Sequence, residues 1–279
     1  MSMIRAVRAR LPLSRPRAFA LHLALSLLAF STLVLAMLLW WFPGELFFLD
    51  GGWQGLKLVA MVDLVLGPLL TLLLYKPGKP KLALDLSMIA LIQVAALGYG
   101  FVTTHEQRTV ALVYADGVFN TLSAQAEAQA AAELRERERE PRAVATLVSG
   151  SPRAGADAPV PLLKTPTPGR EEFGKYLEEL FNGYPEMHER SDKFVVLDAN
   201  DESLSTKALK LEDLENATER EAVRAALGTA ERAGTIELHR FKARYASGIA
   251  LYDPTSARIV DYVAEEDGND TTLAEGGDG

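Results

Sequence analysis

The sequence predicts a membrane protein with three transmembrane α-helices followed by a small periplasmic α+β domain. Three long apolar stretches lie within the first 105 of its 279 residues, and most of the acidic residues follow them. Strand-like and helix-like patterns then alternate after residue 105. The near-neutral mean hydropathy of +0.05 is therefore an average over two unlike parts.

The charge balance separates these two parts. Residues 1–105 carry nine Lys/Arg and four Asp/Glu, a net +5, whereas residues 106–279 carry 20 and 33, a net −13. An acidic chain argues against a nucleic-acid partner, because phosphate binding requires a basic face. The absence of cysteine excludes disulfides, thiol catalysis, Fe–S clusters and cysteine-ligated zinc.

The three apolar stretches are each long enough to cross a bilayer. Residues 18–42 contain no Asp, Glu, Lys or Arg, and residues 56–75 and 82–104 are the second and third predicted spans. The first stretch exceeds the h-region of a cleaved signal peptide and lacks a convincing cleavage site, so we expect it to remain as a helix.

Basic residues in the short flanking segments predict the orientation. Residues 1–17 hold five arginines and no acid, and the loop 76–81 holds three lysines, so both are expected in the cytoplasm. The loop 43–55 and the α+β domain, 105–264, would then lie in the periplasm of a bacterium, with the protein in the inner membrane. The tail 265–279 is acidic and glycine-rich and is expected to be disordered.

Polar residues inside the spans are costly and need partners. At helical rise, Asp63 and Gln93 each lie about 18 Å above the cytoplasmic end of their span, which predicts a hydrogen bond between them. This pair is interpreted either as helix-packing contacts or as a contact with another membrane helix. Gly67 and Pro68 lie one turn away, and proline there predicts a kink and a notch.

A second polar layer is predicted nearer the cytoplasmic face. His22, Thr71 and Asp85 all lie within about 8 Å of it at helical rise. The alternative for Asp85 is an interfacial residue solvated by headgroups. Asp63 and Asp85 differ in depth by about 12 Å, which excludes the carboxylate dyad of an intramembrane aspartyl protease.

Several short motifs together resemble one known family. They are Asp50-Gly-Gly-Trp53, Val62-Asp-Leu-Val-Leu-Gly-Pro-Leu-Leu-Thr-Leu72, Lys76-Pro-Gly-Lys79, His22-Leu with Ser26, Trp41-Phe-Pro43, Asp85-Leu, Gln93 and Tyr99-Gly100. Over residues 18–102 the chain resembles the type IV pilin accessory proteins of the TfpX/TfpZ type. The resemblance implies an inner-membrane protein that assists the stability or assembly of a cognate major pilin, without a catalytic site.

The part after the spans reads as a mixed domain. Strands are predicted at 109–114, 118–119, 143–148, 193–197, 236–245, 248–252 and 258–263, and helices at 121–140, at 171–181 and from Thr218 to about 228 or 234. Thr218 and Glu221 form a capping-box pattern, and residues 151–170, rich in proline, are predicted to be a loop. A free sheet edge could pair with a pilin strand, or the sheet could simply form the domain core.

No spacing typical of a metal site, nucleophile elbow, phosphate loop or dinucleotide site occurs, so neither an enzyme, a metal nor a cofactor is expected. The favoured function is a pilin accessory or chaperone protein whose partners are the bilayer, a cognate pilin and other pilus assembly proteins. Before assembly, a type IV pilin has one apolar membrane helix and a periplasmic head, and Asp63, Gly67, Pro68 and Gln93 are the candidate contacts to that helix. The alternatives are a membrane sensor, or a small transporter or proton-conducting subunit that uses His22, Asp63 and Asp85.

Overall fold

The computed structural model describes residues 14–42, 44–150, 160–166, 173–181, 186–199, 201–229 and 235–265. These residues form two compact units. The membrane unit contains the chain up to Trp41 and from Gly52 to His105, and the α/β unit contains Phe42–Gly51 and everything from Glu106 onward. The predicted tail 265–279 lies outside the described residues except for Glu265.

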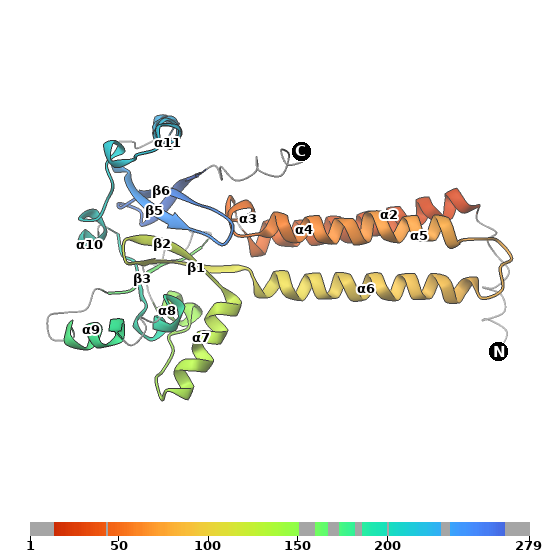
Figure 1. The fold of residues 1–279 in the computed structure, drawn as a ribbon, viewed down its shortest axis with the longest axis horizontal. Coiled ribbons are helices and arrows are strands. Elements are labelled where there is room, and N and C mark those ends of the chain that lie inside the picture. The colour runs from red at the N-terminus through yellow and green to blue at the C-terminus, as the bar shows by residue number, and fades with distance from the viewer. Residues whose placement is uncertain are drawn as a thin grey trace, which may run out of the picture. The chain divides into compact units, whose positions relative to one another are not determined.

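The membrane unit consists of three long apolar helices (Figure 1). The first runs from Arg15 to Trp41, as α2 (Arg15–Ala36) and a π-helical end η1 (Met37–Trp41). The second runs from Gly52 to Leu74 and is made of α4 (Gly52–Ala60), the π-helical η2 (Met61–Leu66) and α5 (Gly67–Leu74). The third is α6 (Leu82–Glu106). Each is long and apolar enough to span a membrane, which makes this a membrane protein.

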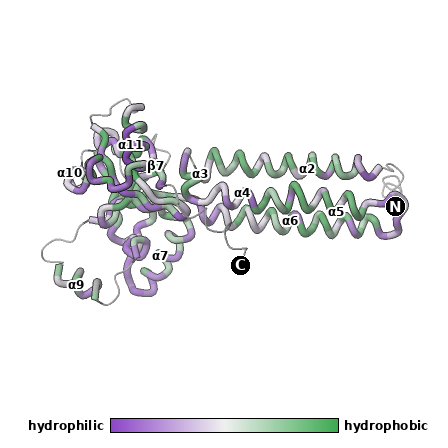
Figure 2. Tube along the Cα trace, turned by 45° about the horizontal axis from the view of Figure 1, so that its top comes forward, coloured by the Kyte–Doolittle hydropathy of each residue, from purple (hydrophilic) through white to green (hydrophobic). Residues whose placement is uncertain are grey.

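Most large side chains of these helices face outward, as hydrocarbon solvent permits. In Figure 2 the tube of the three helices is green along most of its length, which shows their apolar composition. Helix α6 is the least buried of the three, and Leu91, Val94 and Tyr99 are each more than two-thirds exposed. The charged residues Lys79 and Lys81 lie in the turn between the second and third helices.

The α/β unit is built on one mixed sheet of seven strands in the order β4-β3-β1-β2-β5-β6-β7. The β1–β3 and β2–β5 pairs are parallel, and the other four are antiparallel. The strands are β1 (Thr109–Ala115), β2 (Val118–Ser123), β3 (Leu162–Lys164), β4 (Val195–Val196), β5 (Glu237–Lys242), β6 (Ser247–Asp253) and β7 (Arg258–Ala264). The helices are α3 (Leu46–Leu49), α7 (Ala124–Glu136), α8 (Val144–Gly150), α9 (Phe173–Phe181), η3 (His188–Lys193), α10 (Glu202–Ser205), η4 (Leu211–Asp213) and α11 (Ala217–Thr229).

The central strand β1 is buried on both faces of the sheet. Successive side chains of a strand point to opposite faces. Leu112 and Tyr114 accordingly enter one hydrophobic cluster, and Ala111 and Val113 enter another. The β1–β2 turn is Asp116-Gly117, and both residues have positive φ, as a tight hairpin of this hand requires.

The short segment between the first two membrane helices is part of this α/β core. It contains helix α3, and Leu46 and Leu49 lie in the same hydrophobic cluster as Leu112 of β1. The backbone carbonyl of Leu49 accepts a hydrogen bond of 3.1 Å from the N–H of Tyr245. The sequence had predicted a loop at 43–55, and the structure gives residues 42–51 a place in the core of the domain.

Asp50 anchors this segment by its side chain. It is fully buried, and its Oδ1 accepts hydrogen bonds from the Thr121 hydroxyl at 2.9 Å and from the Arg244 backbone N–H at 3.0 Å. Its Oδ2 accepts a third hydrogen bond, from the Thr109 hydroxyl. At the next position, Gly51 has φ +96°, and a Cβ there would overlap the ring of Tyr245. Asp50 is therefore required for its hydrogen bonds, and Gly51 for its positive φ and its contact with Tyr245.

Three local predictions were wrong. Residues 143–148 were predicted as a strand but form helix α8, whose Val144, Leu147 and Val148 recur at helical spacing and whose Val144 N–H bonds to Glu127. Of the loop predicted at 151–170, residues 160–166 are described and contain strand β3, which its pairing with β1 stabilises, and the rest lies outside the described residues. Helix α11 begins at Ala217, with the side chain of Asn216 accepting from the first turn, so Thr218 is not its cap.

Candidate functional site in the membrane helices

One hydrogen-bonded cluster joins all three membrane helices. Nδ1 of His22, on α2, lies 2.5 Å from the Thr71 hydroxyl on α5. Nε2 of the same ring lies 2.6 Å from Oε1 of Gln93 on α6. Buried polar groups in hydrocarbon must bond to one another, and this cluster provides such bonds between helices far apart in sequence.

The chemistry of the Gln93 amide orients the whole cluster. Its NH2 group donates to the backbone carbonyl of Asp63 at 3.3 Å, so its oxygen faces His22. An amide oxygen only accepts, so Nε2 of His22 carries the proton. In the neutral ring Nδ1 is then an acceptor, and the Thr71 hydroxyl donates to it. Each polar group of the cluster thus has a defined role.

Gly67 and Pro68 explain why Gln93 reaches the backbone at this point. In a regular α-helix the carbonyl of Asp63 would accept from the N–H of Gly67, but that N–H bonds to Val62 instead. The next residue, Pro68, has no N–H, so the carbonyl has no donor in its own helix. Gly67 has no side chain, and a Cβ there would overlap the Gln93 amide. The Gly-Pro pair therefore frees the carbonyl and makes room for the amide that binds it.

The structure thus rearranges the two predicted polar layers. Gln93 bonds to the backbone of Asp63 and not to its carboxyl group, and His22 bonds to Gln93 as well as to Thr71. The helix begins at Arg15, whose Nε donates to the Tyr75 carbonyl at 2.8 Å, so counting from Arg15 instead of Arg17 raises His22 by about 3 Å, to about 10 Å. That shift covers only part of the difference of about 10 Å from the predicted height of Gln93, so depth along single helices does not account for this contact.

Asp85 lies apart from this cluster. Its carboxylate accepts a hydrogen bond of 2.6 Å from Nζ of Lys79, in the turn before α6. Among the described residues no hydrogen bond joins it to His22 or Thr71, and a polar layer shared by the three stays a prediction. The ion pair with Lys79 is local: a lysine six residues away and partly exposed offers a full charge to a carboxylate at the end of the span.

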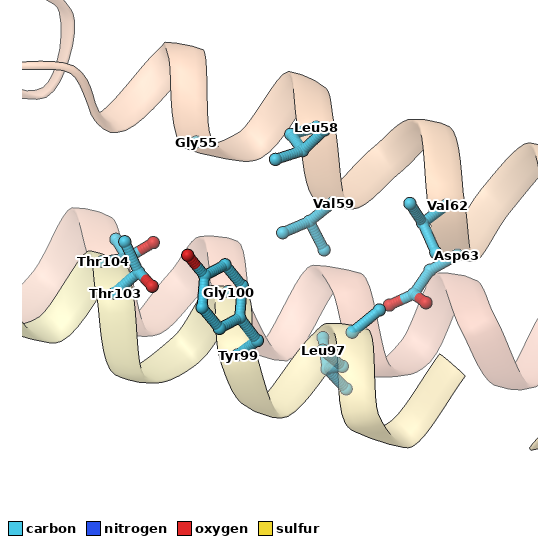
Figure 3. A pocket seen from close by; sticks show the side chains of 11 residues that line it. Gly55, Leu58, Val59, Val62, Asp63, Leu97, Tyr99, Gly100, Thr103 and Thr104 are labelled. Atoms are coloured by element: carbon cyan, nitrogen blue, oxygen red, sulfur yellow. The ribbon is translucent and has the colours of Figure 1, made fainter. Parts of the chain in front are cut away.

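The carboxyl group of Asp63 is left facing a groove. The residue is 4% exposed, and its Oδ1 is buried without a hydrogen-bond donor among the described residues. The groove has a volume of about 190 Å³ and lies between the second membrane helix and α6. In Figure 3 the carboxyl group points from its helix toward the helix that carries Leu97.

The rest of the groove is mostly apolar, and several of its residues are small. Gly55 and Gly100 lie where the two helices approach closely: a Cβ would meet the Thr104 hydroxyl at 3.4 Å and Val59 at 2.9 Å, respectively. The lining residues are Gly55, Leu58, Val59, Val62, Asp63, Ala96, Leu97, Tyr99, Gly100, Thr103 and Thr104. Of the four contacts predicted from sequence, Asp63 lines this groove, whereas Gly67 and Pro68 are buried in the helix packing and Gln93 belongs to the cluster.

The sequence analysis did not predict that residues of α6 form one side of the groove. Ala96 and Gly100 are four residues apart, the small-residue spacing that permits close helix approach. That spacing is the feature of the sequence that could have indicated this side of the groove. It is weak by itself, because small residues also occur in α6 at Gly98, where a Cβ would meet nothing within 4 Å.

A second buried polar group lies in the core of the α/β unit. His239 of β5 is fully buried, with Nε2 3.3 Å from a Glu237 carboxylate oxygen and Nδ1 3.4 Å from the Tyr114 hydroxyl. Burial lowers the pKa of His239, and the carboxylate of Glu237 opposes that shift. Burial also raises the pKa of Tyr114 to about 12, with a smaller contribution from Glu237. Among the described residues, no group of three or more His, Asp or Glu is placed to hold a metal ion.

Fold and site together define a membrane-anchored protein with three candidate spans, an interhelical polar cluster and an attached α/β domain. Over 96 residues it is 31% identical to the fimbrial assembly protein, serogroups C1 and C2, of Dichelobacter nodosus; the match covers 34% of this chain and 73% of that protein. The chain belongs to the family of that fimbrial assembly protein. No family model matches the chain, and no solved structure matches it.

Proposed function

We propose that the protein is a non-catalytic accessory or chaperone protein of type IV pilus assembly that binds a cognate major pilin and assists its stability or assembly. The observation that carries the proposal is the similarity to a fimbrial assembly protein. The narrower assignment to the TfpX/TfpZ type rests on the motifs of the membrane helices and belongs to the proposal.

The architecture supports this proposal. A pilin before assembly offers a membrane helix and a folded head, and this chain has a membrane unit and an α/β unit. We infer that the N-terminus and the loop 76–81 face the cytoplasm, because their basic residues outnumber those near residues 43–55. The α/β unit is then periplasmic, on the side where the pilin head is located. Other pilus assembly proteins are further candidate partners.

The polar residues give less support to a conducting subunit. Such a function would use His22, Asp63 and Asp85 as a path for protons. In the described residues His22 bonds to Thr71 and Gln93, and Asp85 bonds to Lys79. Among the described residues no hydrogen bond joins the three, and the cluster supports a structural role instead.

The test is capture of pilin from membranes. The full-length protein, expressed with its pilin and solubilised in mild detergent, is expected to co-purify that pilin, and deletion of the gene is expected to lower pilin level and surface pili. Restoration by the wild-type gene is the control. Recovery of no pilin from a strain that expresses one, together with unchanged pili in the deletion strain, would overturn the proposal.

A further inference from the structure

The groove beside Asp63 holds a polar atom that the protein itself leaves unsatisfied. Oδ1 of Asp63 is buried and has no donor among the described residues. The polar groups of the neighbouring cluster are engaged elsewhere, since the Gln93 amide donates to the Asp63 backbone and both ring nitrogens of His22 have partners. A polar atom without a partner in hydrocarbon is costly, so it marks a place where a donor from outside is expected.

We propose that this groove seats one transmembrane helix of a partner, and that this helix places a hydrogen-bond donor, such as a hydroxyl, amide or ammonium group, against the Asp63 carboxyl. The inference rests on the proposed function, and the occupant to which it commits is the single membrane helix of a pilin subunit. Of the four residues expected from sequence to contact the pilin helix, this proposal keeps Asp63, through the carboxyl group that faces the groove, and not Gly67, Pro68 or Gln93.

The shape of the groove fits a helix. Gly55, Ala96 and Gly100 are among the residues that line it, and small residues on helix surfaces permit the close approach of a further helix. A helix is about 10 Å across, so a groove of about 190 Å³ receives one row of its side chains rather than the whole helix. Leu58 and Tyr99, both more than 60% exposed, would flank that row.

The chemistry of the groove favours a helix over a lipid chain. A lipid acyl chain can fill the apolar part, where Val59, Val62 and Leu97 lie, but it carries no donor for Oδ1 at this depth. A side chain of a partner helix supplies both apolar contact and the missing donor. Interhelical bonds of this kind contribute modestly to association, which suits a subunit that must be released for assembly.

The experiment measures pilin co-purified with full-length variants. Asp63→Leu removes the acceptor, and we expect a loss of about three- to thirtyfold in bound pilin. Asp63→Asn keeps an acceptor oxygen and is expected to retain more binding than Asp63→Leu. Ala96→Phe fills the groove and is expected to weaken binding similarly, whereas Ala95→Phe, at the adjacent exposed position outside the groove, is the matched control.

Crosslinking gives an independent readout, because the natural chain has no cysteine. The Tyr99→Cys variant, changed on the groove, is expected to crosslink to cysteines in the pilin membrane helix. The control is Val94→Cys, since Val94 is 68% exposed on the same helix but not in the groove, and this variant is expected to react less.

The outcomes separate this inference from the proposed function. Equal pilin capture by the wild type, Asp63→Leu and Ala96→Phe would contradict the groove as the binding site but leave pilin as the partner. Equal capture of a pilin that lacks its membrane helix would have the same consequence. Crosslinks from position 99 only to a second copy of this chain would also overturn it. Failure of the wild type to capture any pilin would instead overturn the proposed function and the inference with it.

Discussion

Replacing Asp50 with alanine is expected to destabilise the α/β unit strongly. The substitution removes the acceptor of three hydrogen bonds, donated by the hydroxyls of Thr109 and Thr121 and by the backbone N–H of Arg244. The segment 42–51 would lose its only carboxylate anchor among the described contacts, while its apolar residues remained in place.

The magnitude follows from the number and kind of these bonds. Hydrogen bonds to a charged group contribute about 1.5–3 kcal/mol each, and such values do not add fully. We therefore expect a loss of about 3–6 kcal/mol in the free energy of unfolding for Asp50→Ala. That is a large share of the roughly 5–15 kcal/mol of an ordinary domain. Asp50→Asn keeps one acceptor oxygen and is expected to lose about 1–3 kcal/mol.

The assay is urea-dependent proteolysis of the full-length protein in mild detergent, which reports the free energy of unfolding of the α/β unit. The control is Asp198→Ala, since Asp198 is exposed and is expected to change stability by less than about 0.5 kcal/mol. The reasoning is refuted if Asp50→Ala costs less than about 1 kcal/mol or no more than the control.

Two further predictions concern Gly67, which packs against the Gln93 amide, and the buried His239. Gly67→Ala is expected to lower the thermal stability of the membrane unit in detergent, because the added methyl group would displace the Gln93 amide. The control is Gly98→Ala, which adds a methyl group in open space and is expected to leave thermal stability unchanged. Equal effects of the two substitutions would contradict the close packing of Gly67 against Gln93. Because burial lowers the pKa of His239 in the folded state, the unfolded chain binds a proton first as the pH falls below about 6.5. The contribution of His239 to stability is therefore present above that pH and declines below it, by at most about 1.4 kcal/mol per pH unit. In urea unfolding between pH 7 and 5, the free energy of unfolding of His239→Phe is expected to fall less steeply than that of the wild type.

The membrane helices could be predicted from sequence because length and apolar composition decide whether a segment can span. The contact between His22 and Thr71 followed from their similar depth. The hydrogen bond from His22 to Gln93 did not, because it depends on where the first helix begins and on the reach of a glutamine side chain. Depth counted along one helix does not show how far a side chain extends to the next.

The α/β unit was predictable as a class but not in its connections. Strands at 236–245, 248–252 and 258–263 were expected from their β-branched and aromatic residues, and the structure has β5, β6 and β7 there. The three-residue strand β3 carries too little local signal, and pairing with β1 stabilises it. The buried role of Asp50 depends on partners up to 194 residues away, which no local pattern reveals.

The place of residues 42–51 in the α/β core makes that domain discontinuous along the chain, which has a consequence for its synthesis. Asp50 leaves the ribosome 194 residues before Arg244, which donates to it in the folded protein. At translation rates of about 5–20 residues per second, the segment waits roughly 10–40 s for its partner. During that interval Leu46, Leu49 and the Asp50 carboxylate have no completed core to enter. A truncation that removes residues 106–279 would leave them in this state permanently, so an isolated membrane unit would need a polar connection in place of residues 42–51 between its first two helices.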